Sequence, residues 1–143
     1  MAETKVLLVD DEVEFTETLS ERLKSRGLNV DSAKSGEDAL KKISEVSYDA
    51  IFLDLAMPGM DGIETLKKLL SKNPDLQVIL LTGHASIDKS VEAVKLGAKD
   101  FLEKPANIDK LLEKIKKAES ERMLIVEKRS QDEIQKILKS KGW

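Results

Sequence analysis

Short runs rich in valine, isoleucine and leucine recur five times along the chain, separated by longer amphipathic stretches. We predict strands over residues 5–10, 29–33, 49–54, 77–82 and 99–103. The first, third and fourth runs are continuously apolar, which is typical of strands buried on both faces of a parallel sheet. One amphipathic helix is predicted after each strand. This alternation predicts an α/β fold with an open, doubly wound, five-stranded parallel sheet.

Apolar residues between the predicted strands recur at helical spacing, and we expect these stripes to pack on the sheet. The stripes are Phe15, Leu19 and Leu23; Leu40 and Ile43; Ile63, Leu66 and Leu70; and Ile87, Val91 and Val94. Gly27 and Gly97 follow two of the stripes, where a helix often ends on a glycine in the left-handed conformation.

The last predicted helix is unusually long, because no glycine or proline interrupts residues 108–141. A helix of that length measures roughly 50 Å, so it would project beyond the domain. We therefore expect a globular domain over residues 4–120 and a helical extension over residues 121–143. The apolar residues of the extension are Met123, Val126, Ile134, Ile137 and Leu138. They form an imperfect heptad pattern, which leaves open a homodimer through this helix or a solvated linker with Trp143 in a solvated tail.

Composition excludes several kinds of site. The 143 residues include no cysteine and one histidine, His84, so disulfides, thiol catalysis, iron–sulfur clusters and multi-histidine metal sites are excluded. Only oxygen ligands remain for a metal ion. The net charge of −3 argues against direct nucleic acid binding by this chain. No secretory or membrane-spanning segment is recognisable, so we expect a cytoplasmic location without membrane contact.

Polar residues stand at the carboxyl ends of four predicted strands, which meet at one edge of a parallel sheet. They are Asp10, Asp11, Asp54, Thr82 and Lys104. Each has an ordinary explanation when taken singly, such as helix capping by the aspartates or surface exposure of the lysine. Together they predict a site. Two carboxylates at about 4 Å repel by roughly 4 kcal/mol at an effective dielectric near 20, so a divalent cation such as Mg²⁺ is expected among them.

The strings LLVDDE, IFLDLAMPGMDG, LLTGH and GAKDFLEKP, in this order, resemble receiver domains of bacterial two-component response regulators, over about residues 4–120. The resemblance is strongest to receivers of the NtrC and DctD type. It implies a flavodoxin-like, CheY-like fold with strand order 2-1-3-4-5. It also implies that Asp54 accepts a phosphoryl group from a sensor histidine kinase. Asp10, Asp11, Asp54 and the backbone carbonyl of Ala56 would hold Mg²⁺.

By the same resemblance, Thr82 and Lys104 contact the phosphoryl group, and Thr82 and Phe101 act as the switch. The surface of the fourth helix, fifth strand and fifth helix would then regulate an output domain or protein partner, as in transcription regulators. The Lys104–Pro105 peptide bond is expected to be cis. We expect no enzyme activity beyond the chain's own phosphorylation and dephosphorylation. The residues after 120 are too few for an ATPase or DNA-binding domain, so the chain acts through protein contacts or is part of a longer regulator.

Two other functions remain open on the same fold. A Mg²⁺-dependent phosphatase with an aspartyl-phosphate intermediate needs an acid two residues after the nucleophile, where this chain has Ala56. A flavin or nucleotide carrier usually cradles phosphate with glycine, serine or threonine after the first strand, where this chain has Asp10 and Asp11. His84 is a poor candidate for phosphorylation or metal binding, because it stands alone.

Overall fold

The computed structural model describes residues 4–57, 61–83, 87–105, 107–140 and 142, and it confirms the predicted fold class. The strands are β1 (Lys5–Val9), β2 (Asn29–Ala33), β3 (Ala50–Leu53), β4 (Val78–Thr82) and β5 (Asp100–Glu103). The helices are α1 (Val13–Ser25), α2 (Gly36–Glu45), α3 (Gly62–Lys72), α4 (Ile87–Leu96) and α5 (Ile108–Ser140). All strand pairs are parallel, in the order β2-β1-β3-β4-β5.

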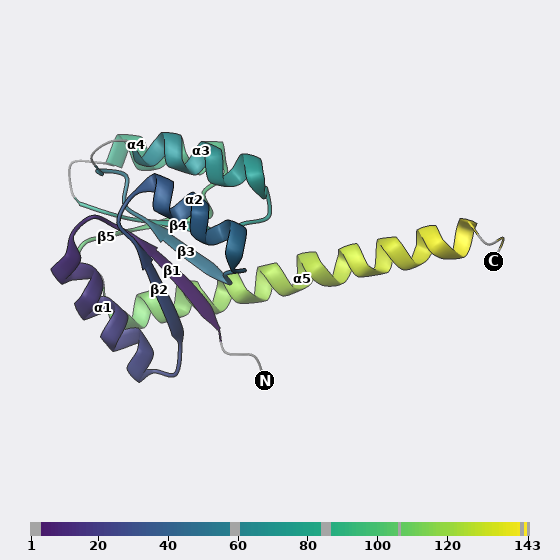
Figure 1. Ribbon diagram of the computed structural model, residues 1–143, viewed down its shortest axis with the longest axis horizontal. Coiled ribbons are helices and arrows are strands. Elements are labelled where there is room, and N and C mark those ends of the chain that lie inside the picture. Colours follow the sequence, from purple (N-terminus) through teal and green to yellow (C-terminus); the bar gives the residue numbers. More distant parts are fainter. Residues whose placement is uncertain (1–3, 58–60, 84–86, 106, 141, 143) are drawn as a thin grey trace.

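The sheet lies between two layers of helices (Figure 1). Alternate residues of the central strands point to opposite faces of the sheet, so each of these strands contributes side chains to two hydrophobic cores. Leu7, Ile51 and Leu80 belong to the core under α2, α3 and α4. Their neighbours Leu8, Phe52 and Ile79 belong to the core under α1 and α5. The continuously apolar runs of the sequence therefore reflect burial on both faces, as predicted.

The apolar stripe predicted for α4 is wrong in its orientation. Val91 and Val94 are 47% and 41% exposed, whereas Ser90 and Ala93 are fully buried. The small side chains of Ser90 and Ala93 allow α4 to lie close to the sheet. The prediction failed because it weighted large apolar residues and ignored a buried face made of small ones. As a result, valine side chains of α4 remain on the surface.

Two glycines end helices where the sequence predicted, and side-chain caps begin two others. Gly27 and Gly97 have positive φ values of 87° and 126° after α1 and α4, which confirms both predicted helix ends. Ser35 and Asp61 cap α2 and α3 by accepting hydrogen bonds from backbone N–H groups three residues later. Glu12, in the same position before α1, makes no side-chain capping bond within the described part of the chain.

Helix α5 has 33 residues and continues far past the sheet (Figure 1). Its last buried residue is Ala118. Beyond that point, Arg122 Nη1 lies 2.6 Å from Asp49 Oδ1, and Arg129 pairs with Asp75. Asp49 precedes β3 and Asp75 precedes β4, so both pairs hold the helix against the amino-terminal edge of the sheet. The predicted helical continuation is therefore confirmed to residue 140.

Trp143 lies outside the described residues. Within the described ranges, none of the helices combines the length and apolar character that crossing a membrane requires.

Replacing Gly62 by alanine should destabilise the fold. A Cβ at this position would lie 2.2 Å from Leu55 Cα, and backbone atoms cannot move aside as a side chain end can. The loss should be about 1–3 kcal/mol or more, which outweighs the gain of up to about 1 kcal/mol in helix propensity. Urea denaturation measures it. Gly83→Ala is the control, because its Cβ would meet open space; equal midpoints for the two variants would contradict the prediction.

Candidate functional site

Two buried aspartates lie side by side at the carboxyl edge of the sheet. Asp10 follows β1 and Asp54 follows β3, and these strands are neighbours. The Asp54 N–H donates to the carbonyl of Val9, and the Asp10 N–H donates to the carbonyl of Ala33. The hydrogen bonds between strands thus continue one residue past β1 and β3 and fix the backbone of both aspartates. Asp10 and Asp54 are only 5% and 3% exposed.

Each aspartate uses one oxygen to hold its own loop. Asp10 Oδ1 accepts a hydrogen bond from the Glu12 N–H at 2.9 Å, and Asp54 Oδ1 accepts one from the Ala56 N–H at 3.0 Å. The other oxygen of each carboxylate faces the site. Asp10 therefore stabilises the start of α1 and also contributes to the cluster, so the two explanations weighed for it from the sequence are compatible.

Lys104, which follows β5, places its ammonium group between these carboxylates. Its Nζ lies 2.6 Å from Asp10 Oδ2 and 3.3 Å from Asp54 Oδ2. The same Nζ lies 3.3 Å from Glu12 Oε1 and 4.5 Å from the centre of the Phe15 ring. A cation over an aromatic face gains additional electrostatic attraction. The Lys104–Pro105 peptide bond is cis, as expected.

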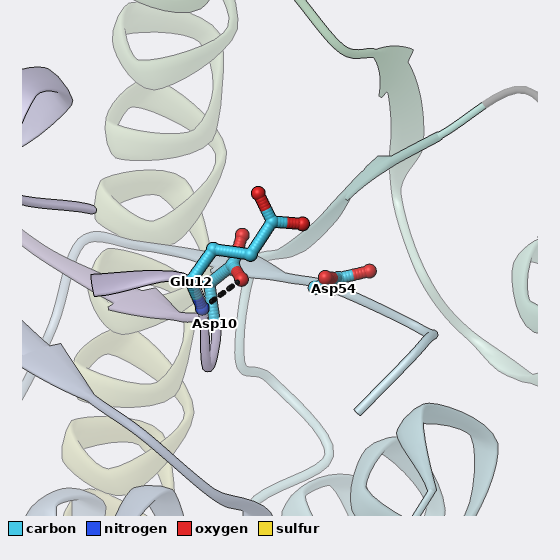
Figure 2. Close-up of side chains that lie close together, drawn as sticks. All are labelled: Asp10, Glu12 and Asp54. Carbon is cyan, nitrogen blue, oxygen red and sulfur yellow. Dashed lines mark hydrogen bonds between the residues drawn. The ribbon is translucent and has the colours of Figure 1, made fainter. Parts of the chain in front are cut away.

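Glu12 is a member of the site that the sequence patterns did not single out. Oxygen atoms of Asp10, Glu12 and Asp54 all lie within 4.8 Å of one another, and Figure 2 shows the three carboxylates grouped together. Asp11 is partly buried and is not part of this group. Glu12 follows Asp10 by two residues across the bend at Asp11, and its N–H donates to Asp10 Oδ1. The spacing of Asp10 and Glu12 after a buried strand was the available signal.

The charge of the cluster is negative overall. Three carboxylates against one ammonium leave two negative charges when all are ionised. Burial raises the pKa of Asp10 above its ordinary value, and the Asp54 charge adds to the rise. The Lys104 ammonium and the Glu12 N–H offset only part of this shift. Burial alone would lower the pKa of Lys104, but Asp10 and Asp54 outweigh it and the pKa is raised, so Lys104 stays charged.

This environment fits a divalent cation. Asp10 Oδ2 is buried and lies 2.6 Å from the Lys104 ammonium, which also contacts Asp54 and Glu12. One ammonium does not balance three carboxylates, and buried charge is costly unless it is compensated. Carboxylate oxygens are the ligands that Mg²⁺ prefers.

The remaining predicted residues lie around this edge. Thr82 is the last residue of β4, and its backbone pairs in register with Glu103 of β5; nothing is described of its side chain. Phe101 lies in β5 and is 37% exposed. Ala56 is exposed and contacts Asp54 through its N–H. His84 lies outside the described residues.

Comparison with known proteins decides the family. The sequence matches the family described as response regulator receiver domain over residues 6–116. The chain belongs to this family. It is 37% identical over 129 residues to the C4-dicarboxylate transport transcriptional regulatory protein DctD of Rhizobium meliloti (strain 1021), covering 90% of this chain and 28% of that protein. It is 41% identical over 113 residues to the transcriptional regulatory protein ZraR of Salmonella typhimurium, covering 79% and 26%.

Solved receiver structures have the same fold. The receiver domain of NtrX from Brucella abortus is similar with a TM-score of 0.76 at 32% identity, covering 80% of this chain and 98% of that one. A receiver domain protein from Clostridium thermocellum reaches a TM-score of 0.81 at 31% identity, covering 85% and 98%. The chain thus spans about a quarter of the length of its curated relatives but nearly all of these solved domains. The resemblance inferred from the sequence is confirmed.

Replacing Asp10 by asparagine should stabilise the metal-free receiver at neutral pH. Because the folded-state pKa of Asp10 is raised, its favourable contribution exists at low pH and is lost as the pH rises through the raised value. At pH 7 its ionisation therefore costs stability, and Asp10→Asn should raise the free energy of unfolding. Urea denaturation in chelator measures this gain, which should shrink toward pH 4.

The exposed Glu14→Gln is the matched control for loss of one negative charge. Added Mg²⁺ should stabilise the unsubstituted protein more than Asp10→Asn. A lower stability of Asp10→Asn at pH 7 in chelator would show that pairing with Lys104 outweighs the burial of the carboxylate.

Proposed function

We propose that this receiver is a phosphorylation-dependent signalling module that accepts a phosphoryl group on Asp54 from a sensor histidine kinase. The observation that carries the proposal is the arrangement of Asp54 itself. One carboxylate oxygen is held by the Ala56 N–H, and the other, buried beside Lys104, faces the edge of the sheet. A carboxylate with one fixed oxygen and one oxygen directed at a cation is suited to nucleophilic attack on phosphorus.

In the proposed transfer, Asp54 Oδ2 forms a bond to phosphorus while the bond from phosphorus to the donor nitrogen breaks. Lys104, already 3.3 Å from this oxygen, neutralises negative charge on the transferred group. Catalysis of such transfers is mainly positioning and electrostatics, which the fixed carboxylate and the buried ammonium supply. The chain is proposed to have no enzyme activity beyond its own phosphorylation and dephosphorylation.

Asp10 and Asp54 would hold Mg²⁺, with Asp11 and the Ala56 carbonyl as the further ligands that family resemblance assigns. When bound, the ion neutralises phosphoryl oxygens during transfer. The burial of Asp10 and Asp54 and the net negative charge of the cluster support this assignment.

The switch is proposed to run from Thr82 to Phe101 and to repack the surface made by α4, β5 and α5. Phe101 is partly exposed beside a helix that carries exposed Val91 and Val94, which supports a surface that can rearrange. Its output would be a further domain or a protein partner, with transcription regulation as the outcome named for the relatives. The proposal includes a cytoplasmic location. It does not include direct binding of nucleic acid or of a membrane.

The alternatives left open from the sequence have less support. Ala56 stands where an aspartyl-phosphate phosphatase would carry its acid, and its side chain has no polar group. A flavin or nucleotide phosphate placed after β1 would meet the buried carboxylates of Asp10 and Asp54. Flavin absorbance and turnover of a phosphate ester test these two alternatives directly.

Incubation with acetyl phosphate and Mg²⁺ should add one phosphoryl group, measured by intact mass. Asp54→Asn should abolish labelling, because the amide is not a nucleophile for phosphorus. Chelator should also abolish it, because the clustered charge is then not neutralised. Asp61→Asn is a control, since this aspartate only caps α3. Labelling of Asp54→Asn at the level of the unsubstituted chain would refute the assignment.

We further propose that the extension of α5 helps to form a homodimer. The side chains of Arg122, Ile125 and Arg129 line one cavity of about 140 Å³ with residues before β3 and β4, which orients the helix. Met123, Ile134 and Ile137 are left exposed on another face. An exposed apolar stripe on a projecting helix is stabilised by a second helix. The alternative is a solvated linker whose neighbouring domain covers the stripe.

Sedimentation at tens of micromolar should show self-association of the intact chain that Ile137→Lys weakens by tenfold or more. A buried lysine in an apolar helix interface is costly unless it is paired. Gln135→Lys introduces the same charge away from the stripe and should leave association unchanged. If the intact chain sediments as a monomer with and without phosphorylation, the linker alternative is the better one.

A further inference from the structure

Lys104 occupies a position that a bound metal ion would disturb. Its ammonium lies 2.6 Å from Asp10 and 3.3 Å from Asp54, the two buried carboxylates that would hold Mg²⁺. Two cations cannot share these oxygens without repulsion. When the ion binds, the ammonium must therefore move away from at least one carboxylate while remaining near enough to meet a phosphoryl group.

Glu12 is placed to receive the ammonium. Its Oε1 lies 3.3 Å from Lys104 Nζ and already accepts a hydrogen bond from it. Its side chain is 61% exposed, which puts the carboxylate on the solvent side of the buried aspartates. Although Glu12 stands at the N-cap of α1, its side chain makes no capping bond within the described residues and is free for this role. The Phe15 ring, 4.5 Å from the ammonium, supports the same position.

We propose that Glu12 is a positioning residue for Lys104, which takes the ammonium when a divalent cation binds to Asp10 and Asp54. This inference rests on the proposed function for its metal ion. Glu12 thereby lowers the free-energy cost of displacing Lys104 and keeps its ammonium at the site. In the structure the ammonium contacts all three carboxylates.

The proposal differs from a direct role of Glu12 on the metal. If Glu12 acts through Lys104, its effect on Mg²⁺ affinity depends on the lysine. If Glu12 is itself a ligand, or acts only by its charge, the effect persists without the lysine. A double-mutant cycle separates these cases, because it isolates the coupling of two residues.

The experiment is calorimetric titration of the full chain with MgCl₂, for the unsubstituted protein, Glu12→Gln, Lys104→Met and the double variant. Exposed charge pairs change an equilibrium constant by up to about fivefold, so Glu12→Gln should weaken Mg²⁺ binding about three- to fivefold. Lys104→Met should tighten it by removing a competing cation. In the Lys104→Met background, the effect of Glu12→Gln should fall below about twofold.

Glu14→Gln, which removes an exposed charge from the first turn of α1, should leave the affinity within about twofold. An undiminished effect of Glu12→Gln in the Lys104→Met background overturns the proposal. So does a Glu12→Gln affinity equal to that of Glu14→Gln, or no measurable Mg²⁺ binding by the unsubstituted chain. If Lys104→Met fails to fold, Lys104→Gln replaces it in the cycle.

Labelling by acetyl phosphate, measured on the same preparation, separates this inference from the proposed function. A normal cycle in a chain that is not phosphorylated on Asp54 refutes the proposed function and retains the role of Glu12. If Asp54 is labelled normally but Glu12→Gln and Lys104→Met have additive effects on Mg²⁺ affinity, the proposed function stands and the role of Glu12 is refuted.

Discussion

The burial of like charges at one edge of the sheet is the constraint on which the site depends. Asp10 and Asp54 are almost completely buried, and the Lys104 ammonium between them offsets part of their negative charge. A buried pair of carboxylates is unstable unless it is compensated. The same instability creates affinity for a divalent cation, which would offset the negative charge of the cluster. Stability is thus lower where the chemistry is expected, which is a common property of functional sites.

The strand order of the sheet brings Asp10, Asp54 and Lys104 together. Because β1, β3 and β5 are parallel, their carboxyl ends meet at one edge, and the residue after each strand needs only to be polar. Local hydrogen bonds then orient the side chains, as the Ala56 N–H does for Asp54. The close packing of Gly62 on the Leu55 backbone fixes the start of α3 directly beyond this loop. The fold therefore supplies positions, and short-range contacts supply orientation.

The sequence predicted β1 and β3 and the residues that follow them because burial on both faces leaves a strong apolar signal, which Asp10 and Asp54 interrupt. It failed on α4, where small residues pack and valines are exposed. It also missed Glu12, since an acid at the start of a helix is ordinary. The contact of Glu12 with Lys104 joins residues 92 positions apart, which no local pattern contains.

The chain from Lys104 through α5 extends from the carboxyl edge of the sheet to its amino-terminal edge. Lys104 directly follows β5 and contacts the site, and α5 begins at Ile108. The far part of the same helix is held at the opposite edge of the sheet by the pairs Arg122–Asp49 and Arg129–Asp75. In the proposed switch, α5 would form part of the surface of α4, β5 and α5 that repacks, and these two pairs would hold the far part of the helix in place while that surface changes.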